Sequence, residues 1–158
     1  MRYISKDIVR ERLQFIADQC RFITESTSRI QSPDEFMTSM NGVVLFNSTC
    51  MCLQTIGETV RQLDDHTNGT LMALYPTIPW GSVKGMRNFI SHEYLSIDHS
   101  VIYATVKKNV PSLQKVIETI LQDFCEGKLD SIFSTPSWCM LSHYTIRRKF
   151  ASASRKSF

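Results

Sequence analysis

The sequence of 158 residues predicts an all-α protein, a helical bundle with an irregular, basic C-terminal extension. Three observations predict this fold class. Apolar residues recur every three or four positions along most of residues 5–124, as on the buried face of an amphipathic helix. Serine, aspartate, proline and glycine stand where these segments begin or end. No stretch before residue 126 alternates apolar and polar residues as a strand would.

Charge divides the chain into two parts. Residues 1–126 carry 12 Lys and Arg against 14 Asp and Glu, whereas residues 127–158 carry six Lys and Arg against a single Asp. We therefore expect one helical domain over residues 1–126, long enough to bury a sizeable core. We expect residues 127–158 to form a basic extension, loosely docked or disordered, with one short helix around residues 138–149. Any phosphate contact of the helical domain must be local, because its net charge is slightly negative.

The first expected helix covers residues 5–30, with apolar positions on one side and charged positions on the other. A second helix is expected to begin at Ser32 and to run to about Leu63. Ser32 is a suitable N-cap, Pro33 occupies the first helical position, and Glu35 completes a capping box.

Two glycines, Gly42 and Gly57, lie inside this second expected helix. Each costs about 1 kcal/mol relative to alanine in a helix interior. We attribute both to close packing against another element, where a side chain would not fit.

Further elements follow along the chain. A turn rich in Asp, Asn and Gly is expected at residues 64–69, and Pro111 should break or kink the last helical stretch. The expected helices are a short one at 71–75, one that starts after Pro79, one at 100–109 capped by Asp98, and one at 113–124. In the helix after Pro79, the residues expected to face the core are Trp80, Val83, Met86, Phe89 and Ile90.

The sequence gives no indication of a membrane span, a metal site or a cofactor. The longest apolar run, residues 43–46, is far shorter than a membrane span, and the N-terminus lacks the apolar stretch of a signal peptide. The five cysteines include no CxxC spacing, and Cys50 and Cys52 point to opposite sides of a helix, so they do not form a zinc site. We expect a cytoplasmic protein with reduced thiols, no membrane partner, and no metal or cofactor.

The stretch GMRNFISHEYLSID, residues 85–98, concentrates polar side chains in an otherwise ordinary helical pattern: Arg87, Asn88, His92 and Tyr94. On an ideal helix Asn88 and His92 are neighbours, whereas Arg87 and His92 are about 140° apart. Arg87 and His92 can meet only if the helix ends near His92 or if a second copy of the helix shares the site. The alternative is that these residues cap and solubilise a helix end.

The spacing Arg-x4-His-x-Tyr, with a polar residue after the arginine, resembles the signature of HEPN-domain ribonucleases, and in particular of the HepT-like toxins. Other segments resemble the same family in its order and spacing, across roughly residues 5–124. They are Ile56-Gly57-Glu58, residues 75–80, residues 85–88, residues 92–94, Ile97-Asp98 and residues 109–113.

The resemblance implies an up-and-down, HEPN-like bundle that forms a homodimer, with two Arg-x4-His motifs in one cleft. It implies an endoribonuclease that cleaves transfer RNA or messenger RNA without a metal and leaves a 2′,3′-cyclic phosphate. Arg87 and His92 would be the catalytic pair, with His92 as general base or acid and Arg87 holding the phosphoryl oxygens. Asn88 and Tyr94 would support the site and contact RNA.

The resemblance also implies a partner, a minimal nucleotidyltransferase antitoxin that transfers AMP to the tyrosine of the motif. AMP on Tyr94 would place negative charge and bulk where an RNA phosphate must lie. An alternative from another class is a catalytically weak HEPN module that binds a nucleotide or a partner protein. A buried His92 that faces only its own core would favour this alternative.

Overall fold

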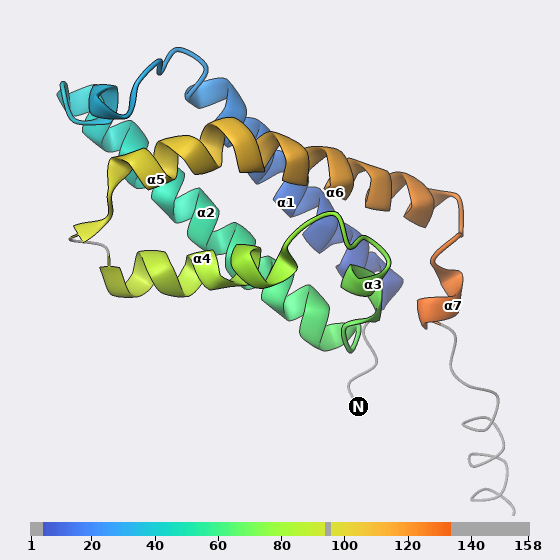
Figure 1. Cartoon of the computed structure of the whole chain (residues 1–158). Coiled ribbons are helices and arrows are strands. Elements are labelled where there is room, and N and C mark those ends of the chain that lie inside the picture. The colour runs from blue at the N-terminus through green and yellow to red at the C-terminus, as the bar shows by residue number, and fades with distance from the viewer. Residues whose placement is uncertain (1–4, 94–95, 134–158) are drawn as a thin grey trace, which may run out of the picture.

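The computed structural model describes residues 5–93 and 96–133, and every regular element among them is helical (Figure 1). This confirms the predicted all-α bundle. Tyr94 and the short helix expected around residues 138–149 lie outside the described residues. None of the helices described is long and apolar enough to cross a lipid bilayer.

The first helix, α1 (Lys6–Ser26), begins where predicted but ends before the predicted residue 30. The Ser5 hydroxyl caps it by accepting a hydrogen bond from a backbone N–H of the first turn at 3.4 Å. At the other end the buried Thr27 hydroxyl donates to the Ile23 carbonyl at 2.7 Å. The buried side chains of α1 are Val9, Leu13, Ile16, Ala17, Cys20 and Ile23.

The second predicted helix is divided into two elements, a 3-10 helix at Pro33–Phe36 and the long helix α2 at Met40–His66. The prediction that this helix begins at Ser32 is therefore wrong. Ser39 is the N-cap of α2, since its hydroxyl accepts from the backbone N–H of Gly42 at 3.0 Å.

Burial of Phe36 explains the break. Its ring is fully buried and packs edge-on against Phe46, with 5.5 Å between ring centroids. The Ser32 hydroxyl donates to the Glu35 carboxylate at 3.4 Å and so does not cap a helix. A Cβ at Gly42 would lie 2.9 Å from the Phe36 carbonyl oxygen and closer still to that of Glu35. The close packing expected for Gly42 is confirmed.

Helix α2 extends beyond its predicted end, and the chain then turns through Asn68 and Gly69 into α3 (Thr70–Ala73). Both turn residues have a positive φ, 50° and 76°, which asparagine and glycine tolerate best. The next helix, α4 (Trp80–Glu93), begins directly after Pro79, as predicted.

The apolar face of α4 is narrower than predicted. Trp80 and Ile90 are buried, and Val83 and Met86 are partly buried against the core. The prediction for Phe89 is wrong, since this residue is 36% exposed. Phe89 lies about 100° from Ile90 around the helix, at the edge of the apolar face.

A single helical run contains α5 (His99–Ala104), a π-helical segment (Thr105–Asn109) and α6 (Val110–Cys125) (Figure 1). Asp98 caps it as predicted, by accepting a backbone N–H of the first turn at 2.7 Å. The chain does not break at Pro111. Because proline has no N–H to donate to the preceding turn, the helix widens before it and then continues.

The first residues of the expected basic extension pack against the bundle. The short helix α7 (Asp130–Phe133) buries Phe133, whose ring meets Phe124 of α6 edge-on at 5.6 Å between centroids. The Asp130 carboxylate lies 2.7 Å from Lys6 Nζ. α7 therefore contacts the last turn of α6 and the first turn of α1.

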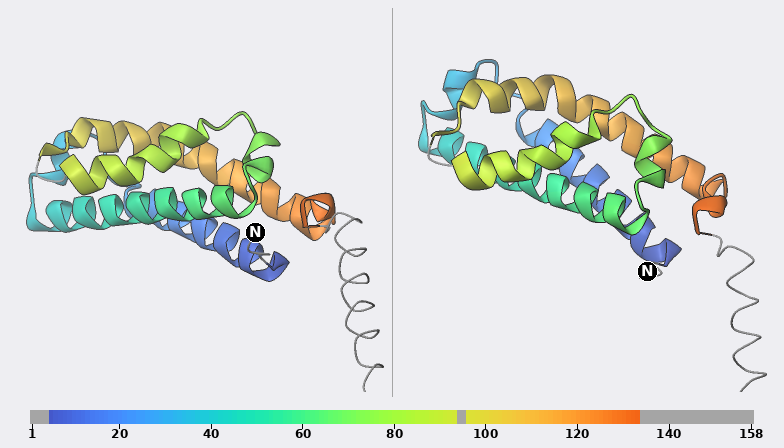
Figure 2. Two further views of the ribbon diagram at one scale, coloured as in Figure 1. Left: turned by 90° about the horizontal axis from the view of Figure 1, so that it is seen from below. Right: turned by 60° about the horizontal axis from the view of Figure 1, so that its bottom comes forward.

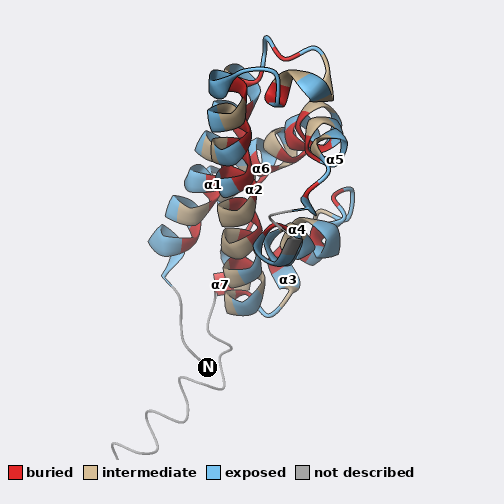
Figure 3. Ribbon diagram, turned by 90° about the vertical axis from the view of Figure 1, so that its left-hand side faces the viewer, coloured by how far each residue is buried: buried red, intermediate tan, exposed pale blue. Residues whose placement is uncertain are grey.

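Helix α2 has the central place in the bundle. It packs against α4 and α1, and α6 lies along α1 (Figure 2). Buried residues line the inward faces of these helices, and exposed residues cover the outer side of α4 (Figure 3). α4 thus presents one face to the bundle and the other to solvent.

Gly42→Ala is expected to destabilise the fold, because the new Cβ would overlap carbonyl oxygens of the 3-10 helix. Overpacking costs about 1–3 kcal/mol, towards the upper end when backbone atoms are met, and exceeds the gain of about 1 kcal/mol in helix propensity. Gly85→Ala is the matched control, since no neighbouring element lies within 4 Å of its Cβ. It should be neutral or stabilising. Chemical denaturation measures both changes, and equal gains in stability would contradict the packing role of Gly42.

Candidate functional site

The outer face of α4 carries three of the four predicted site residues. Arg87, Asn88 and His92 are all exposed, and both catalytic candidates lie within the helix, which ends at Glu93. An exposed His92 is not the buried histidine that would favour a binding module. Tyr94, the fourth residue, lies outside the described residues.

One copy of α4 does not direct Arg87 and His92 to a common point. The helix ends one residue after His92, but both residues are helical, so their separation of five positions corresponds to about 140° around the axis. Ser91, which precedes His92, accepts a hydrogen bond from Gln54 Nε2 of α2 at 3.1 Å. The Arg87 side chain makes a hydrogen bond to that of Asn88, in which Nη1 donates to Oδ1 at 3.0 Å.

The close approach of α2 and α4 determines how near the Arg87 backbone lies to α2. A Cβ at Gly57 of α2 would lie 2.8 Å from the Val83 carbonyl oxygen, 3.1 Å from the Arg87 nitrogen and 3.2 Å from Arg87 Cβ. A side chain does not fit at such distances, so glycine is what lets α4 lie this close to α2. The packing reason expected for Gly57 is confirmed, and it applies at the turn of α4 that carries Arg87.

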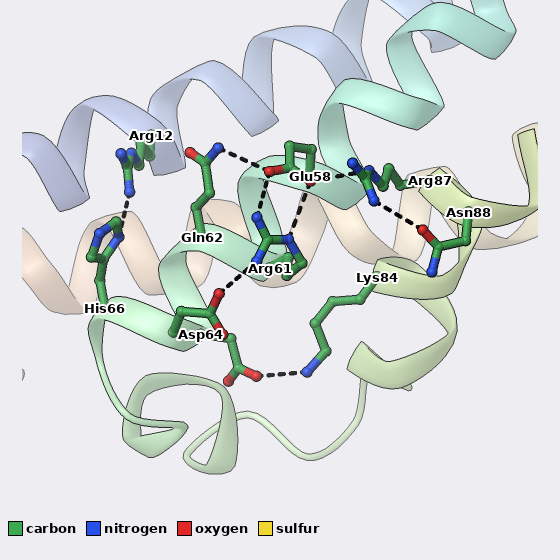
Figure 4. A network of polar contacts seen from close by, with 10 residues as sticks. Arg12, Glu58, Arg61, Gln62, Asp64, His66, Lys84, Arg87 and Asn88 are labelled. Carbon is green, nitrogen blue, oxygen red and sulfur yellow. Dashed lines mark hydrogen bonds and ion pairs between the residues drawn. The ribbon is translucent and has the colours of Figure 1, made fainter. Parts of the chain in front are cut away.

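Glu58 of α2 joins the two helices through its carboxylate (Figure 4). It accepts from Arg61 Nε at 3.2 Å, from Arg61 Nη2 at 2.7 Å and from Gln62 Nε2 at 3.1 Å. From α4, Arg87 Nε lies 3.2 Å from Glu58 Oε2. The carboxylate therefore lies between two arginines of different helices.

These donors keep Glu58 ionised. Hydrogen bonds from Arg61 and then Gln62, with the charges of Arg61 and Arg87, lower the pKa of Glu58 from 4.5 to about 2. At neutral pH its charge balances one of the two arginines. Arg87 is ion-paired with Glu58 and donates one of its five N–H groups to Asn88, and its side chain is 46% exposed. Arg87 is thus accessible to an anion from solvent.

Two further pairs flank this cluster and were not expected from the sequence. Lys84 Nζ of α4 lies 2.6 Å from Asp64 Oδ2 of α2, and Arg12 Nη1 of α1 lies 2.6 Å from His66 Nδ1 (Figure 4). Because a guanidinium only donates, His66 Nδ1 is the acceptor in this hydrogen bond. Contacts between distant helices of this kind leave no local pattern in the sequence.

Arg61 of α2 belongs to the polar cluster around Glu58 but is not part of the Arg-x4-His motif. Glu58 lies three residues before it and Asp65 four residues after it, and Asp65 Oδ2 is 2.8 Å from Arg61 Nη1. This is the spacing of ion pairs along one helix, so a sequence signal for Arg61 existed. The contact of Glu58 with Arg87 had no such signal.

An apolar cavity lies on another side of α4. It has a volume of about 280 Å³ and is lined by residues of α2, α4, the π-helical segment and α6, among them Ile56, Val83 and Met86. Val83 and Met86 belong to the inward face of α4. The candidate site is therefore an exposed helix face and not this cavity.

The side chains that could ligate a metal do not cluster in the part of the chain that the structure describes. Within residues 5–93 and 96–133, no group of three or more His, Cys, Asp or Glu is arranged to hold a metal ion. Cys20, Cys50 and Cys52 are buried free thiols, and burial raises the pKa of Cys50 to about 11. Such thiols act as small apolar side chains.

Fold and site together define a class of protein. It is an all-helical bundle in which the exposed side of α4 carries an Arg-x4-His motif. A family model described as "Ribonuclease HepT-like" matches residues 16–120. The chain belongs to this HepT-like ribonuclease family, which confirms the resemblance seen in the sequence.

Several named proteins are similar to this chain in sequence over most of their own length. A protein of Caldanaerobacter subterraneus subsp. tengcongensis, named as a "putative RNase", is 29% identical over 113 residues, which are 72% of this chain and 94% of its own. A Methanocaldococcus jannaschii protein with the same description is 26% identical over 117 residues, 74% of this chain and 100% of its own. The "probable ribonuclease HepT" of Thermococcus cleftensis is 27% identical over 111 residues, 70% of this chain and 94% of its own. No solved structure gives a significant match.

The lowered pKa of Glu58 gives the stability a pH dependence of definite sign. Because the pKa is lower in the folded state, Glu58 contributes its full stability above about pH 4.5 and loses it as the pH falls toward 2. Glu58→Gln removes this titration. Between about pH 5 and pH 3 the variant should therefore lose less unfolding free energy than the wild type. Urea denaturation across this range measures the difference, and parallel pH curves would contradict it.

Proposed function

We propose that this protein is a metal-independent endoribonuclease toxin that cleaves transfer RNA or messenger RNA. The observation that carries the proposal is the exposed face of α4, where Arg87, Asn88 and His92 stand at Arg-x4-His spacing. Membership of the HepT-like ribonuclease family supports it, as do relatives that are named as ribonucleases.

The reaction can be run by side chains alone. The ribose 2′-oxygen attacks the adjacent phosphorus while a base removes its proton. The bond from phosphorus to the 5′-oxygen of the next nucleotide breaks, and an acid protonates that oxygen. The products are a 2′,3′-cyclic phosphate end and a 5′-hydroxyl end. Imidazole changes protonation near neutral pH and can serve in either role, so His92 is our candidate for proton transfer.

Arg87 is our candidate for stabilising the phosphorane. Negative charge builds on its non-bridging oxygens as the 2′-oxygen adds, and a planar guanidinium can bind two such oxygens at once. Arg87 is ion-paired with Glu58 and donates one of its five N–H groups to Asn88, so N–H groups remain that can bind a phosphate.

We infer a homodimer in which both copies of α4 line one cleft. About 140° separates Arg87 and His92 on one helix, so residues of two copies are needed to flank one phosphate. Met40, Val44 and Met51 share one face of α2 and are 78%, 60% and 61% exposed. Exposed apolar patches mark protein–protein contacts. Met51 is one turn from the α2 residue that hydrogen-bonds α4 beside His92.

A minimal nucleotidyltransferase antitoxin is the proposed partner, with Tyr94 as the acceptor of AMP. Transfer would join the tyrosine oxygen to the α-phosphorus of ATP and release pyrophosphate. Tyr94 is two residues beyond His92, so the new phosphodiester would occupy space that the RNA phosphate needs. Like-charge repulsion and bulk would then exclude RNA.

The purified protein should cleave total RNA and transfer RNA in the presence of a chelator and leave cyclic-phosphate ends. His92→Ala and Arg87→Ala should each lower the rate by about 10²-fold or more, as the loss of an acid–base or charge-stabilising group does. His99→Ala is the matched control, because His99 is half-buried, with 36% of its side chain exposed, and does not belong to the motif. Its rate should equal that of the wild type.

Intact mass must first show that the wild type carries no AMP. If unmodified wild type cleaves no RNA, the ribonuclease proposal is wrong, and the alternative of a catalytically weak module that binds a nucleotide or a partner protein is favoured.

Met51→Glu should convert the dimer to monomers and lower cleavage, because it places a charge in the inferred interface. Leu74→Glu is the matched control. Leu74 is 57% exposed, but it follows α3 and lies outside the apolar face of α2 that Met40, Val44 and Met51 share. Sedimentation velocity gives the mass of each variant. A Met51→Glu protein that stays dimeric and active would contradict this interface.

A further inference from the structure

We propose that Glu58 is a positioning residue for Arg87 and holds its guanidinium in the orientation that binds the RNA phosphate. The inference rests on the proposed function, because the phosphate is that of the RNA cleaved at α4. In this role Glu58 does not touch RNA and acts through Arg87.

Glu58 is itself held in place by its own helix. Arg61 binds both carboxylate oxygens, with Nε 3.2 Å from Oε2 and Nη2 2.7 Å from Oε1, and Gln62 Nε2 donates to Oε1 at 3.1 Å. Arg61 also pairs with Asp65, a 61% exposed side chain whose Oδ2 lies 2.8 Å from Nη1, but Arg61 binds Glu58 through its other two nitrogens. A carboxylate bound by three N–H groups of α2 presents a fixed acceptor to the neighbouring helix.

Arg87 forms an ion pair with this carboxylate through Nε, which lies 3.2 Å from Glu58 Oε2. Gly57 sets the spacing, since a Cβ there would lie 3.2 Å from the Cβ of Arg87. Asn88 Oδ1 accepts from Arg87 Nη1 at 3.0 Å. The ion pair at Nε and the hydrogen bond from Nη1 act on two different nitrogens of a planar group, so together they restrain its orientation.

Proton transfer is not the role of Glu58. Its pKa of about 2, caused first by the hydrogen bonds from Arg61, leaves it without a proton to donate at neutral pH and makes it a weak base. Orientation of Arg87 is the role that its contacts support.

An ion pair that serves the fold alone is the competing explanation, and Asp65 provides the control for it. Asp65 pairs with the same Arg61 from the same helix, but the partners of Arg87 are Glu58 and Asn88. Glu58→Gln and Asp65→Asn each replace one carboxylate of Arg61 by an amide of the same size. Only Glu58→Gln also changes a partner of Arg87.

The test compares steady-state cleavage of a short RNA by full-length Glu58→Gln, Asp65→Asn and wild type, well below their unfolding temperatures. A glutamine is uncharged and has one acceptor oxygen where three N–H groups of α2 converge, so the ion pair that orients Arg87 is lost. We expect kcat to fall about tenfold or more with KM changed by less than about threefold, because the misaligned contact matters most in the transition state. Asp65→Asn should stay within about twofold of wild type. Equal effects of the two variants would overturn the proposal.

A second measurement needs no cleavage and separates failure of this inference from failure of the proposed function. In ¹⁵N NMR spectra, the Nε signal of Arg87, assigned by its loss in Arg87→Lys, should have the same chemical shift in wild type and in Asp65→Asn, because the carboxylate 3.2 Å from Nε is kept in both. In Glu58→Gln the signal should shift. An unchanged signal in Glu58→Gln would overturn the positioning role, whatever the activity. A wild type that cleaves no RNA but shows the expected signals would reject the proposed function and retain the positioning of Arg87.

Discussion

The contact of α2 with α4 at Gly57 is the constraint on which the site depends. Because no side chain separates the two backbones, the next residue of α2, Glu58, reaches the turn of α4 that carries Arg87. Hydrogen bonds one turn before and two turns after this point run between the same helices. The position of the arginine is therefore set by a contact between backbones, which is stiffer than any contact between long side chains.

Local signals in the sequence were sufficient for the fold class and for several helix boundaries. Pro79 and Asp98 begin helices as their chemistry predicts, since each acts within one turn of its own position. The start of α2 was predicted wrongly because Ser32 and Ser39 both precede suitable helical residues. Burial of Phe36 decides between them, and burial depends on residues distant in the chain.

The candidate site could be found from the sequence only as a motif. Arg87, Asn88 and His92 were recognised by their spacing, and the structure places all three on the exposed face of one helix. The partner of Arg87 could not be found in this way, because Glu58 lies on another helix and no sequence period relates the two. The arrangement around a phosphate also depends on a second copy of α4, whose position no pattern within one chain encodes.

The π-helical segment has a consequence for the length of the chain. Ile102, Val106 and Val110 are buried at intervals of four residues, which would drift by about 80° around a regular α-helix, and the wider turn reduces this drift. A wide turn holds one residue more than an α-helical turn. Loss of a single residue there would restore ordinary helix with α6 still facing the core, whereas the same loss within α6 would rotate everything beyond it by about 100°. Insertions and deletions among relatives should therefore gather at Thr105–Asn109.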